Sequence, residues 1–291
     1  MIVNKYSYVL LFLMTALAVS GCSINKIAIN ATGSIIGYGM DALLEESDVA
    51  FAEQSAPANL KLLEGLIKAD PENKHLLISA SYGFSSFSLA FLEGKDNERA
   101  KNFYERGKRY GLRILLQNED FKSAFSQKAD VFKESLKSFN KDDVPALFWT
   151  GFSWGNWINL SLDNPDAIAD LSRVETLMER VRELDETFYY GGVHLFFGTI
   201  YGSRSRMLGG DVERAGKHFD RAIEISGGKF LIAYVYKARF YARPMMEEEL
   251  FKGLLQKVID TPGDVLPEQR LVNEVAKIKA KELFKNMNDY F

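Results

Sequence analysis

A stretch of fourteen residues occurs twice in the chain, and it constrains the fold more than any other feature. Residues 94–107 read GKDNERAKNFYERG and residues 209–222 read GGDVERAGKHFDRA, with identical residues at six positions. Each copy contains an aspartate that can accept hydrogen bonds from the first amide groups of a helix, Asp96 in one and Asp211 in the other. A glutamate follows two residues later, where the helix dipole favours negative charge. The repeat therefore predicts two equivalent helices.

Both predicted helices have small and aromatic residues on one face. Three residues in each copy are spaced by four and then three positions, which places them above one another on a helix. They are Ala100, Tyr104 and Gly107 in the first copy and Ala215, Phe219 and Ala222 in the second. The small residues let a neighbouring helix approach closely, while the ring fills the space beside the contact. These faces predict helix–helix contacts.

An aromatic-rich segment precedes each copy, and its glycine keeps the same distance from the alanine. Gly83 precedes Ala100 by seventeen residues, and Gly198 precedes Ala215 by the same number. A weaker third copy starts at Gly151 and continues into NPDAIADLSRVETLMERV. The sequence therefore predicts an all-α fold of stacked helix hairpins, an α-solenoid or superhelix, because one hairpin cannot bury its apolar face alone. The alternative is a helical bundle whose internal similarity is accidental.

The hairpins resemble degenerate tetratricopeptide repeats. The helix with the small–aromatic–small face is similar to the second helix of that repeat, and the upstream segment is similar to its first helix. The glycine-to-alanine spacing is longer than in the standard repeat, which an elongated first helix would explain. Further helices are expected to start at Pro57, Pro165 and Pro244 and to cover residues 119–139 and 268–287, the last as a polar capping helix.

The N-terminal segment predicts export and lipid attachment. In residues 1–21 a lysine precedes the apolar run SYVLLFLMTALAVSG, which is typical of a secretory signal. The motif VSGC resembles a bacterial lipobox, in which the cysteine, here Cys22, becomes the lipidated first residue of the mature protein. Ser23 favours the outer membrane over the inner membrane, on the periplasmic side. We expect residues 22–291 to form one helical domain that begins with a tether, residues 22–33. The alternatives are a plain signal peptide and a membrane anchor with an incidental cysteine.

Patterns of catalytic or metal-binding residues are missing from the sequence. His75, His194 and His218 are far apart, and none has another histidine or a cysteine at metal-ligand spacing. Phosphate-loop, dinucleotide-binding and nucleophile-elbow motifs do not occur. The net charge of −3, with acidic and basic residues mixed, excludes the basic surface of a nucleic-acid-binding protein. We therefore expect no enzymatic activity, no metal, no cofactor and no second segment long and apolar enough to span a membrane.

Aromatic residues are concentrated in the segment ALFWTGFSWGNWINL, which contains all three tryptophans of the chain. One helix seam cannot bury all of these rings, and residues with polar tips follow in the later helices. A concave apolar groove with a few polar anchors is typical of a small-molecule site. The candidate ligand-binding residues are Trp149, Trp154, Trp157, Tyr201, Arg204, Tyr236 and Arg239. A fatty acid or another apolar ligand suits such a groove, with a carboxylate on an arginine. The alternative is that these rings are ordinary core.

Several segments together resemble the TatT family, the lipoprotein components associated with tripartite ATP-independent periplasmic (TRAP) transporters. They are INKIAIN after the lipobox, FYYGGVHLFFGTIYGSRSRMLGGDVERAGKHFDRAI, KARFYAR, ELFKGLLQKVID and LPEQRLVNEVAKIKAKEL. The resemblance implies an all-helical repeat fold, a homo-oligomer that is a trimer, a hydrophobic ligand, and the periplasmic substrate-binding protein of a TRAP transporter as partner. The segment PMMEEE, residues 244–249, departs from the family pattern and leaves the local partner contacts open.

These observations support one leading hypothesis of function. It is a non-enzymatic, lipid-anchored periplasmic scaffold that binds the substrate-binding protein of a TRAP transporter and assists the uptake of a small hydrophobic solute. The alternative is a general envelope scaffold for protein–protein interaction or lipoprotein assembly. Adjacent genes for a TRAP permease and its binding protein would favour the first hypothesis.

Overall fold

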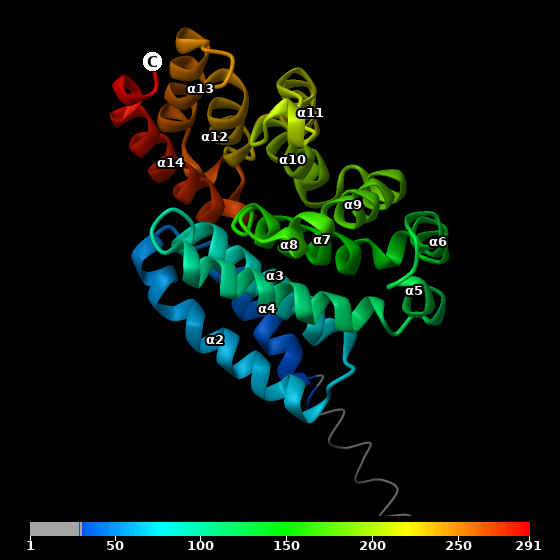
Figure 1. Cartoon of the computed structure of the whole chain (residues 1–291). Helices are drawn as coiled ribbons and strands as arrows, with labels where there is room; N and C mark the ends of the chain where they lie inside the picture. Colours follow the sequence, from blue (N-terminus) through cyan, green and yellow to red (C-terminus); the bar gives the residue numbers. More distant parts are fainter. Residues whose placement is uncertain (1–28, 30) are drawn as a thin grey trace, which may run out of the picture.

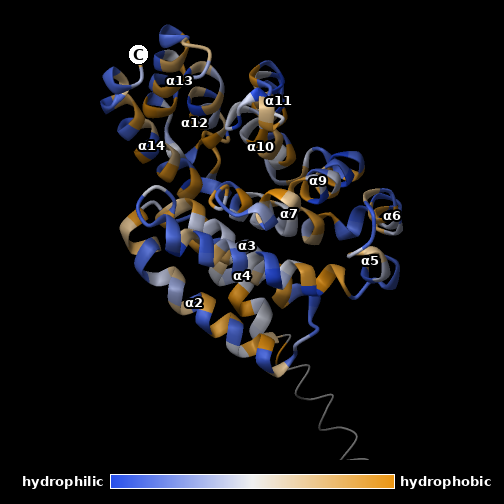
Figure 2. Cartoon of the chain, in the orientation of Figure 1, coloured by the Kyte–Doolittle hydropathy of each residue, from blue (hydrophilic) through white to orange (hydrophobic). Residues whose placement is uncertain are grey.

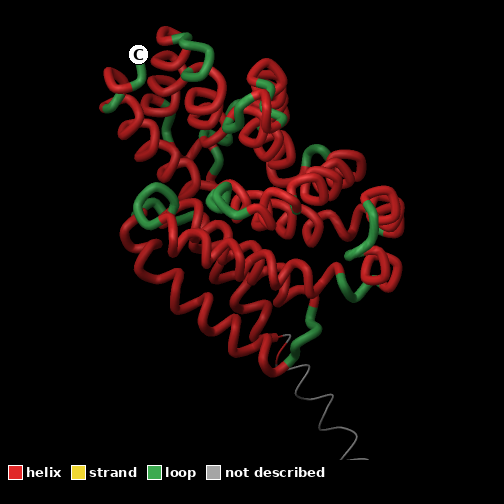
Figure 3. Tube along the Cα trace, viewed as in Figure 1, coloured by secondary structure: helices red, strands yellow, loops and turns green. Residues whose placement is uncertain are grey.

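Helix hairpins, arranged as a curved stack, form the structure (Figure 1). This computed structural model describes residue 29 and residues 31–291, and no strand occurs among them (Figure 3). The predicted all-α fold of stacked hairpins is therefore confirmed. The predicted signal segment 1–21, Cys22 and the first part of the tether lie outside the described residues.

Successive hairpins pack along the stack in chain order. A helix at residues 31–44 comes first among the described residues. The longer helices that follow are α2 Val49–Ala69, α3 Lys74–Phe87, α4 Asn97–Leu115, α7 Val144–Asn159, α9 Leu171–Asp185, α10 Phe188–Gly202, α11 Val212–Ile225, α13 Glu248–Asp260 and α14 Arg270–Lys285. The short helix α12 is Ile232–Lys237. Helix α3 pairs with α4, α7 with α9, α10 with α11, and α12 with α13.

Both copies of the repeated stretch form the second helix of a hairpin, as predicted. Asp96 accepts a hydrogen bond from the amide of Arg99 at 3.1 Å and begins α4, while Asp211 accepts one from the amide of Arg214 at 2.9 Å and begins α11. The residues of the small–aromatic–small faces are all buried: Ala100, Tyr104, Gly107, Ala215, Phe219 and Ala222. The sequence alignment of the two hairpins is therefore structurally correct.

In two hairpins, the glycine in the first helix makes room for a core side chain of the second, whereas Gly83 in α3 lies against Leu60 of α2. A Cβ atom on Gly198 in α10 would lie 2.6 Å from the ring of Phe219 in α11. A Cβ atom on Gly151 in α7 would lie 2.4 Å from the sulfur of Met178 in α9. Real Cβ atoms do not come so close, so only glycine allows these helix pairs to pack at this distance.

Two first helices end in a π-helical turn, which lengthens α3 to nineteen residues in all. Helix α3 continues without a break into the π-helix Ser88–Leu92, and α12 continues into the π-helix Ala238–Ala242. A π-turn contains an extra residue compared with an α-turn, and such turns are frequent at functional sites. The elongation that was expected from the glycine-to-alanine spacing is therefore present in the α3–α4 hairpin.

The predicted helix starts at Pro57 and Pro244 are wrong. Helix α2 begins eight residues earlier, where Asp48 accepts hydrogen bonds from the amides of Ala50 and Phe51, and Pro57 lies inside the helix. The buried face of α2 already includes Ala52 and Ala56, so packing holds the helix together across the proline. Pro244 lies in the turn before α13, which begins at Glu248.

The single helix predicted at residues 119–139 is also wrong, because it is divided into α5, Glu119–Ala124, and α6, Ala129–Ser135. The rings of Phe121 and Phe132 have centroids 5.5 Å apart, and the ring of Phe139 lies at the same distance from Phe121. A straight helix would separate Phe121 and Phe132 by about 16 Å. Burial of the three rings together therefore requires the chain to turn.

The third hairpin differs from the other two in its second half. Pro165 starts a helix as predicted, but this helix, α8 Pro165–Ala169, ends after five residues, and α9 begins at Leu171. Asp170 lies between them and accepts a hydrogen bond from the indole nitrogen of Trp154 at 3.0 Å. The break at Asp170 is the difference between this copy and the other two, whose second helices are continuous.

A contiguous core of buried apolar residues runs through the stack, and apolar and polar residues alternate around most helices (Figure 2). One helical stretch in the described part of the chain, Lys74–Leu92, is long and apolar enough to cross a membrane. The expectation that only the N-terminal segment has this composition is therefore wrong. The stretch is the central helix of the fold, with Leu77, Ala80 and Phe84 buried in the core.

Candidate functional site

An apolar cavity of about 320 Å³ lies inside the stack. Its wall is built from one face each of α3, α7, α10 and α14, together with α12 and its π-helix, α2 and the helix at residues 31–44. Helix α14 was expected to be a polar cap. It does pack on α13, but Leu271, Val275 and Lys279, spaced by four residues, face the cavity. The volume lies in the range of small-molecule pockets.

The cavity is elongated along α3 and α7, each of which lines it over a long stretch. Tyr82 and Glu93 both line it and are eleven residues apart on the α3 segment, which corresponds to about 16 Å along a helix. Trp149 and Leu160 are separated in the same way at α7. Tyr82 and Trp149 thus lie toward one end of the cavity, and Glu93 and Leu160 toward the other. The two ends are chemically different.

Aromatic rings form the first end, which we call the tyrosine end. The ring centroids of Tyr82 and Trp149 are 4.5 Å apart, and those of Trp149 and Tyr189 are 4.8 Å apart. Phe148 and Phe230 pack against Tyr189 at 6.0 and 5.6 Å. Burial raises the pKa of Tyr82 to about 12, so its hydroxyl stays neutral at physiological pH. This end is aromatic and uncharged.

An unusual backbone conformation places Tyr189 at this end. Tyr189, Tyr190 and Gly191 have φ angles of 48°, 58° and 76°, so two consecutive residues with side chains adopt the left-handed conformation. Such residues cost of order 1 kcal/mol each and persist only where other contacts fix them. Here the hydroxyl of Tyr189 donates to Gln269 Oε1 at 3.3 Å and that of Tyr190 to Glu268 Oε1 at 3.1 Å. The turn joins α10 to the segment that begins α14.

Charged side chains gather at the other end, which we call the charged end. Glu93, Arg239 and Lys279 line the cavity there, and the hydroxyl of Tyr104 donates to Glu93 Oε2 at 2.8 Å. Within the described part of the chain, Arg239 and Lys279 have no hydrogen bond or ion pair. Burial lowers the pKa of Lys279, and Glu93 opposes this shift. Two cations and one carboxylate leave this end with net positive charge.

Three of the seven predicted ligand-binding residues line the cavity. Trp149 lies at the tyrosine end, while Tyr236 and Arg239 lie toward the charged end. Burial raises the pKa of Tyr236 well above its usual value, so this hydroxyl is also neutral. Trp149 and Arg239 are 90 positions apart in the sequence, and the stacking of the helices brings both residues to one cavity.

The other four predicted residues lie outside the cavity, each with a different neighbour. Trp154 is bonded to Asp170, and the ammonium of Lys108 lies 3.7 Å from the ring centroid of Trp157. The remaining two, Tyr201 and Arg204, each contact a charged side chain. Tyr201 accepts a hydrogen bond from Arg214 at 2.9 Å, and Arg204 is buried in an ion pair with Glu175 at 3.1 Å.

Sequence reasoning missed Glu93, Lys279, Tyr82 and Tyr189. One signal was available for Lys279, because Leu271, Val275 and Lys279 repeat every four residues on one face of the last helix. An amphipathic face that ends in a lysine is compatible with a cavity wall. No comparable signal distinguishes Glu93 from the other acidic residues that follow helices.

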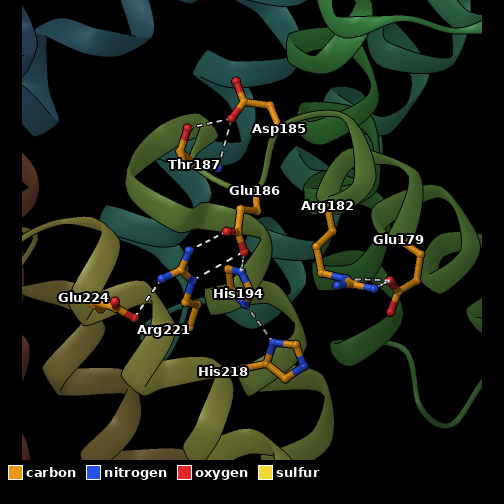
Figure 4. Close-up of polar contacts among 9 residues, drawn as sticks. All are labelled: Glu179, Arg182, Asp185, Glu186, Thr187, His194, His218, Arg221 and Glu224. Atoms are coloured by element: carbon orange, nitrogen blue, oxygen red, sulfur yellow. Dashed lines mark hydrogen bonds and ion pairs between the residues drawn. The ribbon is translucent and has the colours of Figure 1, made fainter.

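Outside the cavity, the fold brings together two histidines that are distant in sequence (Figure 4). The Nδ1 atoms of His194 in α10 and His218 in α11 are 3.0 Å apart, and His194 Nε2 lies 3.0 Å from Glu186 Oε2. Arg221 forms an ion pair with the same carboxylate. Among the residues that the structure describes, no group of three histidine, cysteine, aspartate or glutamate side chains could hold a metal ion.

The geometry of this cluster defines its protonation. His194 Nε2–H donates to Glu186, so the bare Nδ1 of His194 accepts the Nδ1–H of His218, and both rings are neutral. Burial, together with the nearby His194, Arg214 and Arg182, lowers the pKa of His218 to about 4. Burial also lowers the pKa of His194, although Glu186 opposes the shift. The hydrogen bond from Arg221 lowers the pKa of Glu186 to about 2.

We expect this cluster to make the fold sensitive to acid. A histidine with a lowered folded-state pKa stabilises the fold above its unfolded pKa of about 6.5, and this stability is lost as the pH falls toward the folded value. For His218 the loss amounts to roughly 1–2 kcal/mol between pH 7 and pH 5. Urea unfolding at both pH values measures it. His218→Phe should weaken the pH dependence, whereas His75→Gln, a change of an exposed histidine, should keep it. Equal pH dependence in both variants would contradict this prediction.

A family model and one relative match most of the chain. The family model described as TRAP transporter T-component matches residues 45–291, which include every helix from α2 onward. An uncharacterized protein of Treponema pallidum (strain Nichols) is 22% identical over 308 residues, covering 95% of each chain. The family is that of a transporter component of the bacterial envelope and not of an enzyme. The chain therefore belongs to the TRAP transporter T-component family.

Proposed function

We propose that the chain is a non-enzymatic periplasmic lipoprotein that binds the substrate-binding protein of a TRAP transporter and assists the uptake of a small hydrophobic solute. The observation that carries this proposal is the apolar cavity of about 320 Å³, which has an aromatic end and a charged end. An apolar solute in this cavity would gain about 0.8 kcal/mol for each buried CH₂ group. A plain helical scaffold has no need of such a space, because interiors are otherwise close-packed.

The charged end favours an amphiphile over a pure hydrocarbon. A single-chain fatty acid would lie along the cavity with its methyl end at Trp149 and Tyr189 and its carboxylate near Arg239 and Lys279. Hydrogen bonds between charged groups are about twice as strong as neutral ones, and these two cations have no hydrogen-bond or ion-pair partner in the described part of the chain. The proposed solute therefore has one acidic head and one apolar tail.

A titration with matched solutes tests this function. Purified mature protein is titrated with a long-chain fatty acid and with the alcohol of the same chain length. We expect the acid to bind more tightly than the alcohol, and the double variant Arg239→Gln, Lys279→Gln to remove this preference while the alcohol binds as before. The double variant Arg109→Gln, Lys281→Gln, which changes two exposed cations, is the control. If neither the fatty acid nor the alcohol binds to the wild-type protein, the proposed carrier role is contradicted.

Lipid attachment at Cys22 has a separate test. Cys22→Ser is expected to leave the helical fold intact and to release the protein from the membrane, because the VSGC motif supplies the proposed anchor. Cell fractionation with immunodetection measures the share of protein in the membrane pellet, and circular dichroism checks the fold. A variant that stays entirely in the pellet would contradict the lipoprotein assignment.

A further inference from the structure

Charged side chains of opposite sign line one end of the cavity without forming a pair. Glu93 follows the π-helix that ends α3, Arg239 lies in the π-helix after α12, and Lys279 lies in α14. Within the described part of the chain, Glu93 forms no ion pair with either cation. Glu93 and Lys279 are half-buried, where a charge without a partner costs free energy. A ligand with charges of its own can supply the missing partners.

The three charges are close enough to act on the same neighbouring groups. Burial lowers the pKa of Lys279, while Glu93 opposes this shift and Arg239 adds to it. Burial also raises the pKa of Tyr236, and here Glu93 adds to the shift while Arg239 opposes it. Tyr236 lines the cavity as well. The carboxylate, the two cations and this hydroxyl therefore form one cluster around the same end of the cavity.

Glu93 is held in place by a buried hydroxyl. Tyr104 is completely buried, and its hydroxyl donates to Glu93 Oε2 at 2.8 Å. Burial raises the pKa of Tyr104 well above its usual value, so the hydroxyl keeps the proton that it donates. The other oxygen, Oε1, has no hydrogen bond among the described residues. One oxygen thus fixes the carboxylate, and the other is available to a donor in the cavity.

The two cations are suited to an acidic group. Lys279 follows Val275 by one helical turn on the cavity face of α14. The guanidinium of Arg239 packs 4.9 Å from the ring centroid of Phe240, which leaves its N–H groups free of a carboxylate partner. A guanidinium can bind a carboxylate or a phosphate with two parallel hydrogen bonds, and an ammonium adds a point charge. An acidic group bound by both cations therefore lies next to Glu93.

A head group that is only anionic satisfies this cluster incompletely. Its acidic group would contact Arg239 and Lys279, but Glu93 would stay without a partner and would repel it. A head group that carries an ammonium beside its acidic group gives each of the three charges an opposite charge. The ammonium would donate to the available oxygen of Glu93, and hydrogen bonds between charged groups are the strong ones.

We propose that the cavity selects a zwitterionic head group, whose acidic group is held by Arg239 and Lys279 and whose ammonium group is held by Glu93. The alkyl tail of the same ligand extends toward the tyrosine end. An α-amino acid with a long alkyl chain has this chemistry, and so does a lysophospholipid with an ethanolamine head. The inference rests on the proposed function and adds to it the class of head group.

A series of amphiphiles with the same chain length tests the selection. Purified mature protein is titrated, by calorimetry at monomeric amphiphile concentrations, with palmitic acid, palmitylamine, α-aminopalmitic acid and palmitoyl lysophosphatidylethanolamine. We expect the zwitterions to bind with a Kd about tenfold or more below that of palmitic acid, because each adds a hydrogen bond between charged groups. Palmitylamine should bind most weakly, since its ammonium faces two cations and one carboxylate.

The variant Glu93→Gln isolates the role of the carboxylate charge. The amide oxygen of glutamine can still accept the hydrogen bond from Tyr104, so the melting temperature should stay close to that of the wild-type protein. We expect this variant to lose the preference for the zwitterions and to bind palmitic acid as tightly as the wild-type protein or more tightly. The control is Glu98→Gln, which changes an exposed glutamate of α4 and should keep the preference.

The outcomes separate this inference from the proposed function. Equal affinity of wild-type protein for palmitic acid and both zwitterions overturns the inference and leaves the carrier function in place. A preference that persists in Glu93→Gln also overturns it, because the ammonium would then bind elsewhere. A preference for one zwitterion alone supports the inference and identifies the acidic group as a carboxylate or a phosphate. If no amphiphile of the series binds to the wild-type protein, the proposed function itself is overturned.

Discussion

Tryptophan in place of Ala215 or Ala100 is expected to destabilise the fold by about 1–3 kcal/mol or more. Both alanines are completely buried at the contact between the two helices of a hairpin. An indole ring at either position forces the helices apart, because close-packed interiors cannot absorb the added volume without strain. Urea unfolding, followed by circular dichroism, measures the loss. Retention of wild-type stability by both variants would contradict the hairpin packing.

The matched control is tryptophan in place of Ala58. This alanine lies on the exposed side of α2, so the same substitution adds a ring to the surface and not to the core. We expect a change within about 0.5 kcal/mol, which is typical of surface substitutions. A loss as large as that of the buried variants would mean that tryptophan itself, and not its position, destabilises the helices.

Val275→Trp is expected to abolish ligand binding while leaving the fold stable. Val275 faces the cavity from α14, and the indole ring would occupy space that the tail of the solute requires. Filling a cavity with apolar atoms commonly stabilises a protein, so the melting temperature should stay the same or rise. We expect the apparent Kd for a long-chain fatty acid to rise by at least about tenfold, since several CH₂ groups lose their place. Fluorescence titration measures this change.

Tryptophan at Ile278 is the control for the cavity variant. Ile278 lies on the same helix, is 51% exposed and does not line the cavity. Its variant should bind the fatty acid with wild-type affinity. If Val275→Trp also binds with wild-type affinity, the solute does not lie between α14 and the other helices.

The hairpins were predictable because the residues that define each helix lie close together in the sequence. Asp96 and Asp211 indicate where the two helices start, and the spacing of small and aromatic residues indicates which face of each helix is buried. A chain that uses this unit repeatedly must stack the copies to bury their faces. These features gave the correct fold class and the correct second helices of both hairpins.

The places where helices break were not predictable in the same way. Residues 119–139 have an amphipathic pattern that fits one helix, yet Phe121, Phe132 and Phe139 must meet, and the chain turns to allow it. In α2 the opposite happens, because packing on both sides keeps the helix intact across Pro57. In both cases contacts distant in sequence override the local preference.

The candidate site was only partly predictable, since a cavity depends on which helices lie side by side. Trp149, Tyr236 and Arg239 reach it, whereas Trp154 and Trp157, from the same aromatic segment as Trp149, do not. The aromatic content indicated that some rings lie outside the contact between the two helices of a hairpin. It did not indicate which of these rings face the cavity. The turn at Tyr189 was also not predictable from the sequence. Tyr189 and Tyr190 adopt the left-handed backbone conformation, in which glycine is expected.

The central claim is that the cavity holds an apolar solute, and native extraction tests it most directly. Mature protein and the Val275→Trp variant are purified under gentle conditions, and bound lipids are extracted and identified by mass spectrometry. The account predicts that an amphiphile with an acidic head copurifies with the wild-type protein in stoichiometric amount and is missing from the variant. Equal amounts on both proteins, or no more on the wild-type protein than on an unrelated helical-repeat protein, would contradict it.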